Sequence, residues 1–99
     1  MEKEIIWSEF AVRDIREIYN YIRSDSLFYA DRILDEIVNK SETLSSLPMR
    51  GRTTPEIGNP SIREIFVKQY RLIYEIEERR IVIHNIIHMA RDYEAMLKE

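Results

Sequence analysis

Cysteine is absent from the sequence, which excludes disulfide bonds, thiol catalysis and thiolate metal sites. Glycine and proline are scarce, and the two glycines and three prolines all lie within residues 48–60, which predicts a loop there. Long apolar runs are also missing, because the longest, at residues 81–87, is far short of the roughly 20 residues that a membrane-spanning helix needs. The N-terminus lacks the basic and apolar segments of a signal peptide. We therefore expect a cytoplasmic protein without a membrane partner.

The composition is that of one compact domain over residues 1–99, since 44% of the residues are hydrophobic and they recur along the whole chain. The formal net charge of -3 argues against binding through bulk attraction to phosphate, and we expect no direct sequence-specific DNA binding by this chain alone. Residues 1–49 carry 6 basic and 10 acidic side chains, whereas residues 50–99 carry 9 and 8. An anion-binding surface is therefore expected in the second half.

The first half of the chain has the hydrophobic periodicity of helices. Four apolar residues recur at spacings of four, three and four: Ala11, Ile15, Ile18 and Ile22. This stripe predicts a helix from about Ser8 to Arg23, with one buried face and Ser8 as its N-cap. A second stripe follows the polar residues 24–26 and consists of Ala30, Ile33, Leu34, Ile37, Val38 and Leu44. The two stripes predict an antiparallel helical hairpin.

The second half has the composition of β-strands. Three runs rich in β-branched and aromatic residues, at 62–68, 71–76 and 81–87, are separated by short polar turns and predict an antiparallel meander. Residues 4–7 are a candidate for a further short strand. The predicted fold is therefore α+β, with a two-helix antiparallel hairpin packed on a mainly antiparallel three- to four-stranded sheet. A short C-terminal helix is expected over residues 90–99.

Alternation along the predicted strands assigns their side chains to two faces of the sheet. The helix-covered face is expected to hold Leu72, Tyr74, Ile76, Ile81, Ile83 and Ile87. The expected core joins this face to the helices and contains Ile15, Ile18, Ile22, Ile33, Ile37, Leu72, Tyr74 and Ile83. The opposite face is expected to be open to solvent and to carry Phe66, Arg71, Ile73, Glu75, His84 and His88.

The two histidines, His84 and His88, lie four residues apart. On a helix this spacing would bring both rings to one face, but on a strand the two residues would lie about 13 Å apart, so no metal site is expected. No cofactor is expected either. His88 with Arg71 and Arg91 could supply a general acid beside phosphate clamps, a layout suited to RNA cleavage. Alternatively, His88 and Arg91 connect the terminal helix to the sheet.

The order helix, helix, loop and three strands carries a series of markers. They are Trp7, Ser8, Ala11, Asp14, Ile15, Ile18, Tyr21, Ile22, Leu47, Pro48, Gly51, Arg52, Pro55, Glu56, Ile62, Arg63, Glu64, Tyr70, Arg71, Ile73, Tyr74, His88, Arg91 and Asp92. In this joint order they resemble the RelE/ParE superfamily of toxins from type II toxin-antitoxin systems, and the resemblance runs over nearly the whole chain, from Trp7 to Arg91.

The loop and strand motifs look most like the ParE branch, whose known action is inhibition of DNA gyrase. In the RelE branch, a pair of strand lysines supports ribonuclease chemistry, and Ile62 and Glu64 stand at those positions here. The resemblance therefore implies a plasmid-stabilization type of toxin that inhibits growth through gyrase and is neutralised by a cognate antitoxin.

The alternative is a RelE-like, ribosome-dependent mRNA endonuclease, with the ribosome and mRNA as its partners. A related ribonuclease branch uses a loop glutamate as base, a strand arginine and a C-terminal histidine. Those roles would fall on Glu56, Arg71 and His88. A further alternative is an inactive family member that only binds a partner.

Antitoxins of this superfamily wrap the toxin with an otherwise disordered and commonly acidic segment, so the resemblance implies a basic contact surface. The residues expected to bind the target or the antitoxin are Arg50, Arg52, Arg63, Phe66, Arg71, Ile73 and Arg91. The other interpretation is that the arginines are paired internally, with Glu56, Glu64 or Glu75.

Overall fold

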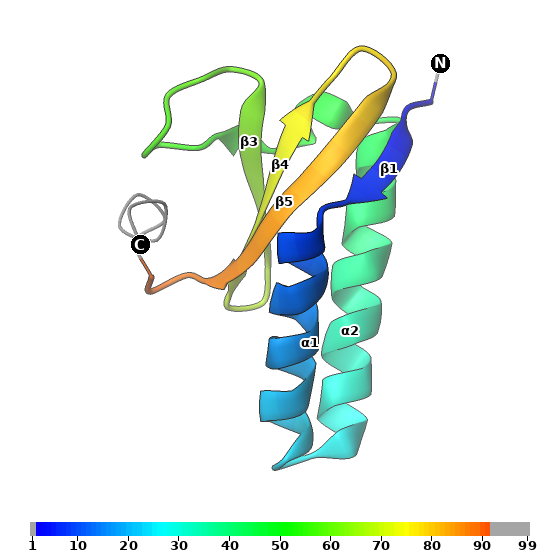
Figure 1. Ribbon diagram of the computed structural model, residues 1–99, viewed down its shortest axis with the longest axis vertical. Coiled ribbons are helices and arrows are strands. Elements are labelled where there is room, and N and C mark those ends of the chain that lie inside the picture. Colours follow the sequence, from blue (N-terminus) through cyan, green and yellow to red (C-terminus); the bar gives the residue numbers. More distant parts are fainter. Residues whose placement is uncertain (1, 92–99) are drawn as a thin grey trace.

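The computed structural model describes residues 2–91 and has two layers, a sheet and a helical hairpin that covers one of its faces (Figure 1). The sheet has five strands in the order β1-β5-β4-β3-β2. Its strands are β1 (Glu4–Trp7), β2 (Arg52–Thr53), β3 (Ile62–Val67), β4 (Tyr70–Ile76) and β5 (Arg80–His88). The helices are α1 (Glu9–Arg23) and α2 (Leu27–Glu42), followed by the short 3-10 turns η1 (Thr43–Ser45) and η2 (Pro48–Arg50). The predicted α+β class is confirmed.

Serine caps begin both helices, as the sequence indicates for the first of them. The Ser8 hydroxyl accepts a hydrogen bond from the Ala11 amide at 3.0 Å, and Ser26 does the same for Tyr29 at 3.1 Å. Each cap satisfies an amide that would otherwise have no partner in the first helical turn. The Ser8 hydroxyl also donates to the carbonyl oxygen of His84 at 2.9 Å, which joins the start of α1 to β5.

Strand β1 runs parallel to β5, whereas the other neighbouring strands are antiparallel. The sheet therefore remains mainly antiparallel, as predicted, but it has one strand more than the three or four expected. The additional strand is β2, in which Arg52 and Thr53 pair with Glu64 and Arg63. Two residues are too few to produce an alternating pattern, and they lie in the segment rich in proline and glycine.

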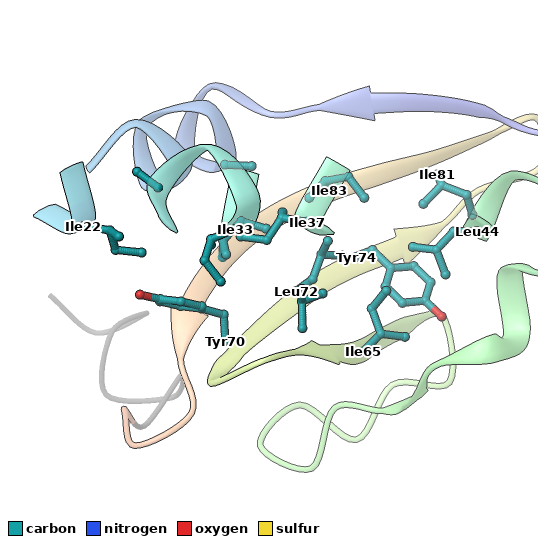
Figure 2. Close-up of a cluster of buried hydrophobic side chains, with 14 residues drawn as sticks. Ile22, Ile33, Ile37, Leu44, Ile65, Tyr70, Leu72, Tyr74, Ile81 and Ile83 are labelled. Atoms are coloured by element: carbon teal, nitrogen blue, oxygen red, sulfur yellow. The ribbon is translucent and has the colours of Figure 1, made fainter. Parts of the chain in front are cut away.

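The hydrophobic core lies between the hairpin and the sheet (Figure 2). Five of the residues predicted to form it are at most 1% exposed: Ile33, Ile37, Leu72, Tyr74 and Ile83. Ile22 is also buried, whereas Ile15 and Ile18 are half-buried and pack against the cluster. Each fully buried aliphatic side chain contributes about 1.5–3 kcal/mol, so this layer is the main source of stability.

A β-bulge between β4 and β5 changes which side chains face the helices. Ile73 pairs with Asn85 but Tyr74 pairs with Ile83, so His84 is an extra residue on β5. Because side chains alternate, the extra residue reverses the assignment of everything that follows it. Ile86 rather than Ile87 therefore faces the helices, and the prediction for Ile87 is wrong.

The bulge also changes the face to which the His88 side chain points. His88 pairs with the core residue Tyr70, so its side chain lies on the same face as that of Tyr70. The prediction that it shares a face with Arg71 is therefore wrong. Of the C-terminal helix predicted over residues 90–99, all but residues 90 and 91 lies outside the described part of the chain. Between residues 2 and 91, no helix is both long and apolar enough to cross a membrane.

Candidate functional site

Arg71 is at the centre of an ion-pair network on the face of the sheet opposite the helices. Its side chain is only 8% exposed. The Nη1 and Nη2 groups donate to the two carboxylate oxygens of Glu56, at 2.8 and 2.7 Å. Nε donates to Oε1 of Glu64 at 3.0 Å, and Nη2 donates to the same oxygen. The guanidinium is therefore held between two carboxylates, one of them in bidentate geometry.

Glu64 joins Arg71 to a second arginine. Its other oxygen, Oε2, accepts a hydrogen bond from Nε of Arg52 at 2.7 Å and forms a salt bridge with Nη2 of the same arginine, also at 2.7 Å. The Glu64 side chain is fully buried, whereas that of Arg52 is 61% exposed and lies over the Phe66 ring, 5.2 Å from its centre. Two arginines and two glutamates make the network neutral.

The hydrogen bonds that Arg71 donates to Glu56 raise the pKa of Arg71, and Glu64 acts in the same direction. Burial opposes this effect, because removing a cation from water disfavours its charged form. The carboxylates outweigh the burial, so Arg71 is a permanent cation with its hydrogen-bond donors already engaged.

The strand register explains how these residues come together. Arg52 lies directly opposite Glu64 across β2 and β3, and the pair is a cross-strand salt bridge. Arg71 lies opposite Phe66 across β3 and β4, one residue pair further along the ladder than Ile65 and Leu72. The network is therefore a consequence of the same antiparallel pairing that builds the sheet.

Gly51 permits the close approach of β2 to the sheet. A Cβ at this position would lie 2.5 Å from the backbone oxygen of Glu64 and 2.6 Å from the Tyr74 hydroxyl. The Gly51 amide donates to that hydroxyl at 2.9 Å, and the hydroxyl donates to the carbonyl oxygen of Pro48 at 2.8 Å. Arg63 also binds this segment, through the carbonyl oxygen of Gly51 at 2.9 Å. These contacts hold Arg52 beside Glu64.

Glu56 reaches Arg71 from the loop between β2 and β3. Within residues 55–61, Glu56 is the only residue that is not exposed. The loop turns back through Gly58, which has a φ of 72°, a conformation that favours glycine. The carboxylate of Glu56 is thus the inward-pointing group of an otherwise solvent-facing loop.

The structure brings Glu56 and Arg71 together but places His88 elsewhere. The His88 ring contacts the ring of Tyr70 edge to face, with 5.7 Å between centroids, and its Nδ1 accepts from the Ala90 amide at 3.1 Å. Because Tyr70 and Arg71 are consecutive strand residues, their side chains point to opposite faces. Glu56, Arg71 and His88 therefore do not form one site.

The expected solvent exposure of this face is wrong for its central residues. Ile73 is fully buried and packs with Ile87 and Ile62 in a second hydrophobic cluster. Arg71 is covered by its carboxylate partners. Phe66 is 40% exposed, as anticipated, and Arg91 is exposed with its carbonyl oxygen 3.4 Å from Nη1 of Arg71. Internal pairing thus holds for Arg52 and Arg71.

A groove beside β3 combines Arg50 and Lys68, two of the basic residues of the second half in which the sequence predicts an anion-binding surface, with Lys40 of the first half, which the sequence does not indicate. It has a volume of about 470 Å³ and is lined by Glu36, Asn39, Lys40, Thr43, Arg50, Phe66, Val67 and Lys68. Of these, only Arg50 and Phe66 are among the predicted binding residues. Lys40 and Lys68 come from α2 and from the turn after β3, and no feature of the sequence indicates that they lie near Arg50.

The groove follows an open edge of the sheet. Strand β2 pairs only with Arg63 and Glu64, so residues 65–67 of β3 have no strand partner on that side within the described chain. Backbone groups at such an edge can accept an added strand.

No group of three or more histidine, aspartate and glutamate side chains among residues 2–91 could hold a metal ion. His84 instead bonds Glu75, with 2.8 Å between Nε2 and Oε1. This pair is about one third exposed. It lies away from Arg71, toward the other end of β4.

Residues 5–93 match the sequence model of the family described as "ParE toxin of type II toxin-antitoxin system, parDE". The chain belongs to this ParE toxin family. The assignment agrees with the superfamily that the order of sequence markers indicates. No curated protein sequence matches the chain.

Solved structures show the same fold at low sequence identity. A chain of the chromosomal ParDE system from P. aeruginosa aligns with a TM-score of 0.73 and 19% identity, over 88% of this chain and 96% of that one. A chain of the RelBE2 toxin-antitoxin complex from Mycobacterium tuberculosis aligns with a TM-score of 0.67 and 22% identity, over 89% of this chain and 99% of that one. A mutant of E. coli toxin RelE in complex with an antitoxin RelB peptide aligns with a TM-score of 0.60 and 18% identity, over 99% of this chain and 94% of that one.

Proposed function

We propose that this ParE-family protein is a cytoplasmic toxin that stops growth by binding DNA gyrase and is neutralised by a cognate antitoxin. The observation that carries the proposal is the family match over residues 5–93. Gyrase is the target that the ParE branch implies. Both steps require binding surfaces rather than a catalytic centre.

The face of the sheet opposite the helices, which carries Arg71 and is called the polar face below, favours inhibition by binding over RNA cleavage. A general base must be able to reach the proton it removes, and in the free protein both oxygens of Glu56 are engaged by Arg71, so Glu56 could act as a base only after its release. His88, the expected general acid, points to the other face of the sheet. The net charge of -3 also gives little attraction to ribosomal RNA.

An assay on purified components tests this proposal. The toxin should inhibit DNA supercoiling by gyrase and leave mRNA on purified ribosomes intact. His88→Ala should inhibit gyrase as well as the unaltered chain does, because His88 has no catalytic role in this account. Cleavage of ribosome-bound mRNA that is lost in His88→Ala would instead establish the endonuclease. Failure to affect either target would favour a protein that only binds a partner.

The groove beside β3 is the surface best suited to the antitoxin. Its rim carries Lys40, Arg50 and Lys68, and its wall includes Phe66 and Val67, so it offers positive charge beside apolar surface. All three structural neighbours come from toxin-antitoxin systems, and two are described as complexes with an antitoxin. The groove has one carboxylate, Glu36, whose Oε2 lies 3.9 Å from Nζ of Lys68, against three cationic side chains. An acidic antitoxin segment would complement this surplus of positive charge.

Charge reversal distinguishes the groove from the rest of the surface. Arg50→Glu should weaken antitoxin binding and slow association most strongly at low salt, since rim charges mainly affect the association rate. Arg79→Glu makes the same change at an exposed position beyond the groove and should leave both quantities nearly unchanged. Equal effects of the two variants would exclude the groove as the antitoxin site.

A further inference from the structure

The two carboxylates that bind Arg71 differ in how firmly they are held. Glu64 is on β3, between β2 and β4, and its side chain is fully buried. Glu56 is on an exposed loop, its side chain is 18% exposed, and it binds the outer Nη edge of Arg71. Glu64 is therefore a fixed counterion, whereas Glu56 is in a position where another anion can replace it.

The loop that carries Glu56 is a locally closed unit. The amides of Ile57 and Gly58 donate to the carbonyl oxygen of Thr54, and the Ile62 amide donates to that of Asn59. The C-terminal end of the loop is attached to the sheet, because the Ile76 amide donates to the carbonyl oxygen of Ser61 at 2.8 Å and Nε of Arg63 donates to that of Pro60 at 2.9 Å. The part that can shift without breaking these bonds is therefore residues 55–58. In Figure 1 it extends from the sheet on the side away from the hairpin.

Thr54, at the base of the loop, is buried with an unsatisfied side chain. Its hydroxyl is the one buried side-chain polar atom among residues 2–91 that has no hydrogen-bond partner. Such a group loses its bonds to water without replacing them, at a cost in free energy. A movement that hydrates this hydroxyl at the base of the loop would offset part of the loss of the Glu56 contact.

Release of Glu56 would leave an unbalanced positive charge next to open space. The network would then hold two arginines and one carboxylate, a net charge of +1. A hollow of about 280 Å³ adjoins it, lined by Arg52, Pro55, Glu56, Phe66, Arg71 and Met89. This space exceeds that of a carboxylate or phosphate group, and the two Nη donors of Arg71 match either one in bidentate geometry.

We propose that the Nη edge of Arg71 is an oxyanion site, which Glu56 occupies in the free protein and yields to a carboxylate or phosphate group of a binding partner. Residues 55–58 move as a unit during this exchange, while the bonds of Pro60 and Ser61 to the sheet are kept. Glu56 thereby prevents adventitious anions from binding while the partner is absent. The exchange does not depend on gyrase being the target, so this proposal and the proposed function can fail independently.

Anion titration of the full chain, followed by the NMR signal of the Arg71 Nε–H group, tests the exchange. Inorganic phosphate and acetate serve as separate probes for the two chemical sources. Glu56→Gln keeps the size of the side chain but removes its charge. It should bind at least one probe about tenfold more tightly than the unaltered chain, equivalent to ~1.4 kcal/mol. A gain for phosphate alone would indicate a phosphate group, and a gain for acetate alone a carboxylate.

Glu77→Gln is the matched control, because it removes one carboxylate from the exposed pair with Arg80. It should give no gain, and adding Arg71→Lys to Glu56→Gln should abolish the gain. Equal affinities in Glu56→Gln and the unaltered chain, or the same gain in Glu77→Gln, would overturn the proposal. If Glu56→Gln does not fold, Glu56→Asp retains the charge with a shorter reach. It should give a smaller gain, and no gain would overturn the proposal equally.

Discussion

The two faces of the sheet are held by different kinds of interaction. The helix-covered face buries hydrocarbon, with Leu72, Tyr74 and Ile83 in its centre. The opposite face buries charge, with Arg71 between Glu56 and Glu64. Hydrophobic contacts tolerate changes of shape, whereas a buried charge network depends on every partner.

This difference indicates where function is to be sought. A buried ion-pair network is often no more stabilising than hydrophobic residues of similar volume. Ile73 and Ile87 show that the polar face can also bury apolar side chains. A need for stability therefore does not by itself account for the ion pairs beside them, and the anion exchange proposed at Arg71 gives them a role.

The largest expected effect on stability is the loss of Glu64. Glu64→Gln should lower the free energy of unfolding by about 3–5 kcal/mol, since it leaves the buried Arg71 and its neighbour Arg52 without their shared counterion. Denaturant unfolding measures the change. Glu77→Gln, at the exposed pair with Arg80, should change stability little. Similar losses in both variants would show that burial of the network is energetically unimportant.

Truncating a side chain in the core on the helix-covered face should cost a similar amount of stability to Glu64→Gln, but for a different reason. Ile83→Ala should lower the free energy of unfolding by about 2–5 kcal/mol, because Ile83 is fully buried and the change leaves a cavity. Ile62→Ala, at a half-buried position on the polar face, provides the comparison. Its loss should be clearly smaller, and an equal loss would contradict the assignment of the main core to the helix side.

Tyr74 connects the core to the segment before β2. We expect it to make a smaller contribution to the free energy of unfolding, and one that depends on pH. Burial is the main cause that raises the pKa of Tyr74 above its ordinary value. The folded protein favours the neutral phenol, so its contribution is present at neutral pH and lost as the pH rises above the unfolded tyrosine pKa of about 10.

Tyr74→Phe tests this directly. At neutral pH it should cost about 1 kcal/mol, because the amide of Gly51 and the carbonyl oxygen of Pro48 lose their partner. The free energy of unfolding, measured across the alkaline pH range, should fall less steeply with pH in the variant than in the unaltered chain. Burial also raises the pKa of Tyr70, so part of the fall should remain. Identical pH profiles would exclude Tyr74 as a contributor.

Local patterns were sufficient to predict most of the fold. The 3.6-residue period that places Ile22 on the buried face of α1, and the Ser8 cap, depend only on neighbouring residues. The bulge at His84 does not, because one extra residue leaves no mark in the alternating pattern. It reversed the assignments of Ile87 and His88.

The candidate site was less predictable because it depends on contacts between distant segments. Arg71 and Glu56 were both identified as functional candidates, but their bidentate pairing requires the loop to fold back over the sheet. The groove residues Lys40 and Lys68 meet Arg50 only when α2 packs beside β3. No periodicity or short motif records such a contact.

The central claim is that Arg71 and Glu56 are bound to each other in the free protein, and a double-mutant cycle measures this most directly. The cycle compares unfolding of the unaltered chain, Glu56→Gln, Arg71→Ala and the double variant. We expect a favourable coupling free energy of about 1–3 kcal/mol between the two side chains, reduced only slightly by salt because Arg71 is buried. A coupling within experimental error of zero would contradict this claim.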